Sequence, residues 1–141
     1  MGIRDAAEAI AQVRSYFARR DDVKLVLVFG SAARDALTAA SDVDIAVAGD
    51  RALDGAAFLA AQSELSALLG RPVDLIDLGR AEGLILREAV TRGLRVKTDA
   101  RLFVKFQIKA LGYLEDFLPL QRAMRDARLA RFIHGSGYSK S

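Results

Sequence analysis

Asp42 and Asp44 stand at the start of an apolar segment that runs to Ala48. The alternation of polar and apolar residues here predicts a β-strand, on which side chains two residues apart share one face, with Cα atoms about 6.6 Å apart. Two carboxylates at that spacing repel each other unless a cation lies between them. Because no histidine or cysteine lies nearby in the sequence, these oxygen ligands favour magnesium or manganese over zinc.

A third acidic side chain on a neighbouring strand would complete a two-metal site of the kind used in phosphoryl transfer. The segment 73–78 has the apolar composition of a strand and carries both Asp74 and Asp77. The period of a strand places these two carboxylates on opposite faces. Strand spacing alone leaves both of them as candidates for the third ligand.

Gly30 and Ser31 follow an apolar segment and have the chemistry of an anion-binding turn. Glycine lets the backbone approach a phosphate closely, and the amides of a helix beginning at Ser31 would bind the anion. The Ser31 hydroxyl adds a donor, and Arg34 adds a planar guanidinium. A Gly-Ser or an Asp-x-Asp pair alone is common, but the combination across two strands predicts a nucleoside triphosphate bound with magnesium.

Hydrophobic periodicity predicts the elements that position these residues. Apolar residues recur at helical spacing in four segments, 3–19, 56–69, 81–92 and from Asp99 onward. Short apolar runs predict strands at 25–29, 42–48, 73–78 and 94–97. The alternation of helices and strands predicts an α/β (α+β) fold, a mixed sheet of about four strands with helices packed on it and further helices at the C-terminus.

The composition is that of a globular protein of one domain. The chain has 141 residues, 52% hydrophobic and 28% charged, and no cysteine, which excludes a disulfide framework. We expect one domain over 1–141, with its core at about 20–98, a helical part at about 99–133 and a flexible tail at 134–141. The longest apolar runs have about five residues, whereas a bilayer span needs roughly 20. We therefore expect a cytoplasmic protein with no membrane contact.

Charge divides unevenly along the chain. Residues 1–78 hold 8 Lys and Arg against 12 Asp and Glu, whereas residues 79–141 hold 13 against 6. The basic half carries an aromatic stripe that we expect in the core, formed by Phe103, Phe106, Tyr113 and Phe117. It also carries cations at every fourth residue, which we expect on one face: Lys97, Arg101, Lys105 and Lys109. That face is either merely solvated or contacts an acidic partner or nucleic acid phosphates, and nucleic acid contact is not favoured. Arg87, Arg92 and Arg95 either reach a nucleotide or lie at helix ends.

The motif Gly30-Ser31, ten residues, Asp42-x-Asp44 resembles the signature of the DNA polymerase β-type nucleotidyltransferase superfamily. The chain is most similar to its minimal branch, the MNT-type proteins often encoded beside a HEPN-family toxin. The resemblance covers roughly residues 20–98 and includes Ser41 and the run Pro72-Val73-Asp74-Leu75. It implies that Asp42, Asp44 and Asp74, and not Asp77, are the catalytic metal ligands. It also implies nucleotide binding by Gly30, Ser31, Arg34 and Ser41.

The resemblance implies an enzyme that transfers AMP from ATP with two Mg²⁺ ions, for which Mn²⁺ is an alternative. The acceptor would be a hydroxyl, expected on a tyrosine of a HEPN-family toxin, and the chain would be the antitoxin that forms a complex with it. Two other functions stay open: a non-catalytic antitoxin that neutralises its partner by binding, and a nucleotidyltransferase that modifies a small molecule such as an antibiotic. The shortness of the chain favours a macromolecular acceptor.

Two positions depart from the family pattern. Ala32 stands where the family often has a basic residue, and Asp35 where it often has glycine. Loss of a cation and gain of a carboxylate beside the phosphate site are expected to weaken nucleotide binding. Neither change removes a metal ligand.

Overall fold

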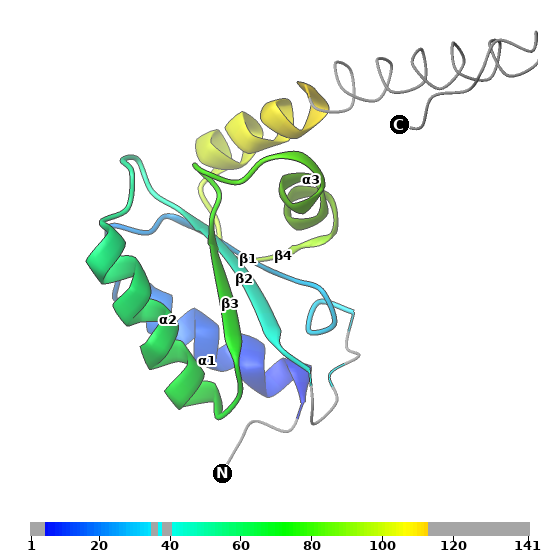
Figure 1. The fold of residues 1–141 in the computed structure, drawn as a ribbon. Coiled ribbons are helices and arrows are strands. Elements are labelled where there is room, and N and C mark those ends of the chain that lie inside the picture. The colour runs from blue at the N-terminus through cyan, green and yellow to red at the C-terminus, as the bar shows by residue number, and fades with distance from the viewer. Residues whose placement is uncertain (1–4, 35–36, 38–40, 113–141) are drawn as a thin grey trace, which may run out of the picture.

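A computed structural model describes residues 5–34, 37 and 41–112, which form a mixed four-stranded sheet between two layers of helices (Figure 1). The strands lie in the order β3-β2-β1-β4, with bounds β1 Leu25–Phe29, β2 Val43–Ala48, β3 Val73–Asp77 and β4 Leu94–Lys97. The helices are α1 Ala6–Ala18, α2 Gly55–Leu69, α3 Gly83–Arg92 and a helix at 100–112. β1 is antiparallel to both β2 and β4, whereas β2 and β3 are parallel and connected through α2.

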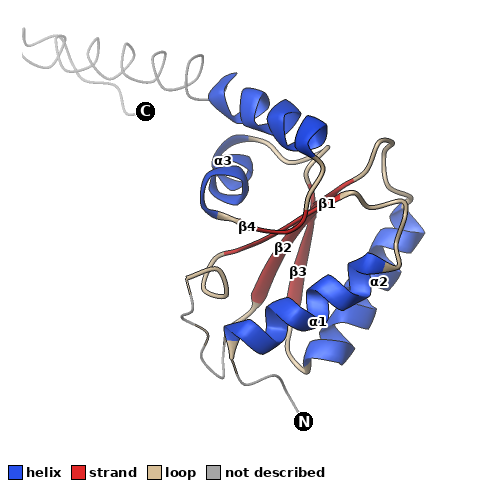
Figure 2. Ribbon diagram, turned by 180° about the vertical axis from the view of Figure 1, so that it is seen from behind, coloured by secondary structure: helices blue, strands red, loops and turns tan. Residues whose placement is uncertain are grey.

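Side chains that alternate along the strands pack into two hydrophobic cores, one on each face of the sheet. Val26, Val28 and Ile45 belong to a core with α1 and α2, and Leu27 and Ala46 belong to a core with α3 and the helix 100–112. Figure 2 shows α1 and α2 together on one side of the sheet and the other two helices on the opposite side. Because helices cover both faces, every residue of β1 is buried, as expected for the central part of such a sheet.

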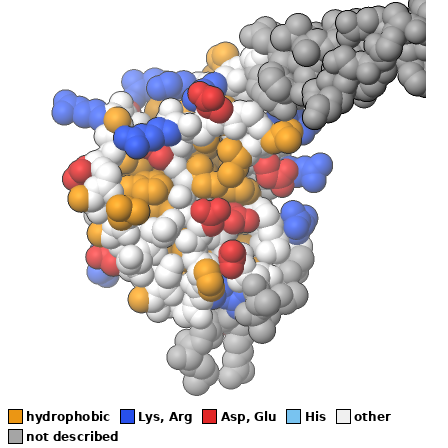
Figure 3. Space-filling view, viewed as in Figure 1, with side chains coloured by type: hydrophobic (Ala, Val, Ile, Leu, Met, Phe, Trp, Pro, Cys, Tyr) orange, Lys and Arg blue, Asp and Glu red, His pale blue; other side chains and the backbone are white. Residues whose placement is uncertain are grey.

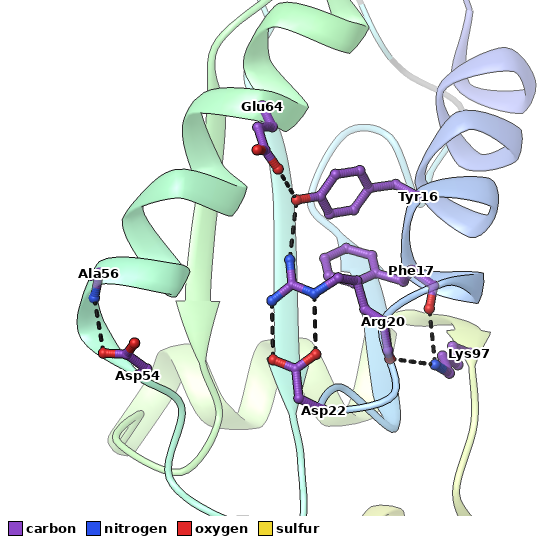
Figure 4. Close-up of polar contacts among 8 residues, drawn as sticks. All are labelled: Tyr16, Phe17, Arg20, Asp22, Asp54, Ala56, Glu64 and Lys97. Atoms are coloured by element: carbon purple, nitrogen blue, oxygen red, sulfur yellow. Dashed lines mark hydrogen bonds and ion pairs between the residues drawn. The ribbon is translucent and has the colours of Figure 1, made fainter.

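Polar contacts connect α1 to its neighbours (Figure 4). The Tyr16 hydroxyl donates to Glu64 of α2, and Arg20 forms two hydrogen bonds to Asp22 just after α1. Lys97 Nζ donates to the carbonyls of Phe17 and Arg20 at 2.9 Å each, so this cation caps the C-terminal end of α1. The prediction that Lys97 shares one basic face with the cations of the following helix is therefore wrong.

Most predicted elements are confirmed within one to three residues, including the strand 94–97. The α+β class with a mixed four-stranded sheet is confirmed as well. The helix expected to begin at Ser31 is wrong for the residues described there, because 31–34 form a turn closed by the Arg34 amide donating to the Gly30 carbonyl at 3.3 Å. Of the aromatic stripe, Phe106 is buried and Phe103 packs against the core, as expected.

Some predictions fall outside the described residues. They concern Tyr113, Phe117, the end of the helical part expected at about 99–133, the tail 134–141 and Asp35. Over the ranges that the structure does describe, no helix has the length and apolar character needed to cross a bilayer.

Candidate active site

The two strands that carry the acidic residues lie side by side at one end of the sheet. Asp44 pairs with Phe29 of β1 on one side and with Asp74 of β3 on the other. Asp42 lies just before β2, two residues from Asp44, and is close enough for its charge to act on that carboxylate. Asp42 and Asp74 are exposed and Asp44 is half-buried. Figure 3 shows acidic side chains gathered on the surface of the molecule beside hydrophobic ones.

Gly30 lies directly after β1 and packs against the Asp44 carboxylate at this end of the sheet. Its φ of +71° lies in the left-handed region, which favours glycine. A Cβ atom at Gly30 would overlap Oδ2 of Asp44, so the backbone of the turn and this carboxylate are in direct contact. The Gly-Ser turn and the Asp-x-Asp strand, separate in the sequence, thus form one site.

Like charge and burial act together on Asp44. Burial raises its pKa, and the Asp74 and Asp42 carboxylates raise it further, while Arg34 acts in the opposite direction. In the described part of the chain, none of the three carboxylates has a hydrogen bond or an ion pair with another side chain. The site therefore concentrates negative charge around Asp44, and Arg34 acts against it.

The electrostatics lead to a prediction about the metal-free protein. In the unfolded chain Asp44 titrates near 3.8, and in the folded chain its pKa is higher, so the fold gains stability below pH 3.8 and loses it as the pH rises through the folded value. At pH 7, with EDTA present, Asp44→Asn should therefore raise Tm, by roughly 2–5 °C. The gain should shrink as the pH falls toward 4, which thermal unfolding followed by circular dichroism can measure. An unchanged or lower Tm at pH 7 would contradict the claim that charge repulsion at Asp44 destabilises the metal-free fold.

Two side chains of α2 hold the strand that carries Asp74. The Val73 amide donates to Ser66 Oγ at 3.1 Å, and the Leu75 amide donates to Gln62 Oε1 at 2.9 Å. β3 is an edge strand, and these contacts satisfy two amides of its backbone on either side of Asp74. Sequence reasoning missed both residues, because a serine and a glutamine on a helix carry no signal for a contact with a distant strand.

Removing the Ser66 hydroxyl should therefore affect both the edge strand and the site. Ser66→Ala leaves the Val73 amide without its acceptor, which should cost about 1 kcal/mol of unfolding free energy. A looser position of Asp74 should also lower kcat by roughly tenfold, the scale seen when outer contacts of a ligating residue are removed. Urea denaturation and the transfer rate measure the two effects. Ser63→Ala on the exposed side of the same helix should change neither, and equal behaviour of the two variants would contradict this role.

The start of β2 is held in a similar way. Nη1 of Arg71 donates to the Ser41 carbonyl at 3.1 Å, and the Val43 amide donates to the Pro72 carbonyl at 3.0 Å. These contacts fix the backbone on both sides of Asp42 against the chain that enters β3. Sequence analysis did not identify Arg71, whose role depends on the pairing of two segments about 30 residues apart.

Asp77 has a structural role instead. Its Oδ1 accepts the Gly79 amide at 2.9 Å, and its Oδ2 lies 3.8 Å from Arg80 Nε. Its register partner is Val47, three positions along β2 from Asp44. Asp77 thus lies away from the carboxylate site and caps the turn after β3.

The remaining residues of the nucleotide prediction lie around the Gly30 turn. Ser31 is half-buried and Arg34 is exposed. Ala32 is almost fully buried in the core with α1 and α2. A basic side chain at this position would have to leave that core, so the departure from the family pattern matches the packing of this chain.

The donor set fits a hard divalent cation in its chemistry. Asp44 and Asp74 on paired strands, with Asp42 just before β2, supply the oxygen ligands that magnesium prefers. In the described ranges, no three acidic, histidine or cysteine side chains already converge as a metal-binding group. The exposed side chains of Asp42 and Asp74 would therefore have to turn toward a bound ion.

Several solved toxin–antitoxin structures share this fold. A toxin–antitoxin structure with AMP-PNP superposes with a TM-score of 0.72 and 24% identity over 84% of this chain and 96% of the matched chain. A complex of tri-AMPylated Shewanella oneidensis HEPN toxin with MNT antitoxin gives 0.68 and 22% over 86% and 97%. The toxin–antitoxin MntA-HepT gives 0.66 and 22% over 84% and 95%.

The similarity in sequence is to a family rather than to individual proteins. No curated protein matches the chain in sequence. The model of the family "Polymerase beta, Nucleotidyltransferase" matches residues 11–101, which are more than half of the chain and include every residue of the site from Gly30 to Asp74. The chain therefore belongs to the polymerase beta nucleotidyltransferase family.

Proposed function

We propose that this chain is a magnesium-dependent adenylyltransferase that moves AMP from ATP to a hydroxyl of a partner protein. One observation carries the proposal: the register that places Asp44 between the Gly30 turn and Asp74. A phosphate-approaching glycine and neighbouring carboxylates form the two halves of a nucleotide site in a family that transfers nucleotidyl groups. The Gly30 turn and the carboxylates would thus bind the same nucleotide substrate.

Asp42, Asp44 and Asp74 would hold the magnesium ions, with Mn²⁺ as an alternative. Bound there, the metal supplies charge neutralisation and Lewis-acid activation of phosphate and hydroxyl oxygens. The acceptor oxygen forms a bond to the α-phosphorus of ATP, and the bond from that phosphorus to the β-phosphate oxygen breaks, so pyrophosphate leaves. The exposed Asp74 carboxylate accepts the proton of the hydroxyl. Ser31, Ser41 and Arg34 hold the phosphates so that pyrophosphate departs in line.

The partner is proposed from the structural neighbours. Their complexes pair an MNT antitoxin with a HEPN toxin that is AMPylated in one case. By this analogy the acceptor is a tyrosine hydroxyl of a HEPN-family toxin, and the chain acts as its antitoxin in the cytoplasm. Adenylylation adds bulk and negative charge to the toxin, which would silence it.

The test is incubation of the purified chain with Mg²⁺ and the protein encoded by the neighbouring gene, in parallel with α-labelled and γ-labelled ATP. Nucleotidyl transfer predicts that the α label alone appears on the partner, because the γ-phosphate leaves with pyrophosphate. A tight complex without label would favour neutralisation by binding. Label on a small molecule but not on the protein would favour a small-molecule transferase.

A further inference from the structure

A groove of about 680 Å³ lies between α3, β4 and the helix 100–112. The two helices lie next to each other in both ribbon views (Figures 1 and 2). Its lining is largely apolar and includes Val90, Phe103, Val104, Ile108 and Leu111. The groove is separate from the residues of the nucleotide site.

The helix 100–112 has two apolar stripes, and within the described ranges only one of them is buried. Leu102, Phe106 and Ala110 face the core with α3. The second stripe runs along the groove with the spacing of one helix face, and its members are 50%, 63% and 52% exposed at Val104, Ile108 and Leu111. A soluble protein rarely leaves such a continuous stripe open to water, so it indicates an interaction surface.

The groove is also positively charged. Arg87 and Arg95 line it, and none of the described residues that line it is acidic. The Arg95 guanidinium lies 4.5 Å from the centre of the Phe103 ring, which holds the cation at the groove wall. Arg87 Nε is buried and has no hydrogen-bond partner among the residues that the structure describes. An anionic group in the groove would compensate the Arg87 charge, which has no ion pair among the described residues.

We propose that this groove binds an acidic amphipathic helix of the partner protein. The identity of that partner rests on the proposed function. The apolar stripe would receive the hydrophobic face of that helix, and Arg87 and Arg95 would pair with carboxylates at its border. A second copy of this chain fits poorly, because a symmetric contact would bring the same arginines together. Nucleic acid fits poorly as well, since it offers no hydrophobic face for the exposed stripe.

The location of the groove is consistent with delivery of an acceptor. On β2 the side chain of Asp44 lies on the same face of the sheet as that of Ala46, two residues on. On β3 the same holds for Asp74 and Ile76. Ala46 belongs to the core under α3 and the helix 100–112, and Ile76 packs against it. The carboxylates and the groove helices thus occupy the same face of the sheet. A partner bound in the groove would extend along the face that bears the reacting site.

Two matched pairs of variants test the proposal, with the neighbouring gene's protein as the probe and its Kd measured by isothermal titration. Ile108→Asp is paired with Leu59→Asp on α2, whose side chain is also 63% exposed. Arg95→Glu is paired with Arg14→Glu, another exposed arginine, on α1. Each groove variant should weaken binding by about tenfold or more, and each control by less than about twofold. Unchanged Tm and unchanged ATP affinity would show that the groove variants keep their fold and nucleotide site.

Equal affinities within each pair would overturn the docking surface and leave the proposed function standing. Complex formation that depends on the groove but yields no label transfer would contradict the proposed catalysis and support the surface. Absence of any complex would contradict both. Two further results would overturn the choice of occupant: self-association of the chain that Ile108→Asp abolishes, or binding of a short RNA that the groove variants weaken.

Discussion

Asp44→Asn should abolish AMP transfer, with a loss of roughly 10³-fold or more in kcat. The substitution keeps the size of the side chain but removes the charge at the centre of the site, where Asp44 pairs with Asp74 and contacts the Gly30 turn. Activation by a bound cation contributes several kcal/mol, and about 1.4 kcal/mol corresponds to a tenfold change in rate. Transfer of the α label from ATP to the partner measures the effect.

The control for this variant is Asp77→Asn on the neighbouring strand β3. Asp77 caps the turn after β3, so its substitution should cost some stability but keep transfer within a few-fold of the wild-type rate. Wild-type activity of Asp44→Asn would contradict the assignment of the site. So would an equal loss in both variants, because it would indicate general damage to the paired strands β2 and β3.

Gly30→Ala should lower both stability and transfer. An alanine at φ +71° is strained by about 1 kcal/mol, and its methyl group would overlap the Asp44 carboxylate. Asp44 would have to move, and a displacement of about 1 Å can cost roughly 10²-fold in rate. We therefore expect a drop in transfer of that order together with a decrease in Tm of a few degrees, measured by the label assay and by thermal unfolding.

Gly70→Ala separates the strain of the backbone from the effect on the site. Gly70 ends α2 with a φ of +66°, so its substitution carries a similar conformational cost. It should lower Tm to a similar extent and leave transfer nearly unchanged. If Gly70→Ala reduced transfer as much as Gly30→Ala, the loss would follow from general destabilisation, and the contact with Asp44 would not matter for catalysis.

The strand that begins at the candidate ligands Asp42 and Asp44 could be predicted from the sequence because its signal is local. The Asp-x-Asp spacing and the strand period define the face of Asp42 and Asp44, and the resemblance chose Asp74 over Asp77. The register that pairs Asp44 with Asp74 agrees with that choice. The binding roles of these residues stay predictions, since they depend on the metal and the nucleotide.

What the sequence could not reveal depends on contacts between distant segments. Lys97 has the spacing of a surface cation, yet its Nζ caps α1 about 80 residues away. Ser66 and Arg71 support the site through backbone atoms, which have no side-chain pattern to detect. Ser31 has the composition of a helix cap, but the chain after Gly30 forms a turn. At Lys97 and Ser31 the packing of the chain overrode the local pattern.

The repulsion at Asp44 connects the stability of the chain to its activity. Neutralising Asp44 should stabilise the metal-free protein and at the same time remove transfer, because the same charge carries out both effects. Added Mg²⁺ should stabilise the wild-type chain and have a much smaller effect on Asp44→Asn.

The central claim is that Asp42, Asp44 and Asp74 form a working site for adenylyl transfer to a partner protein. The intact mass of the neighbouring gene's protein, measured after incubation with the chain, ATP and Mg²⁺, tests it most directly. The account predicts a mass increase by one or more adenylyl groups with the wild-type chain and no increase with Asp44→Asn. A partner whose mass does not change with the wild-type chain, or increases equally with Asp44→Asn, would contradict it.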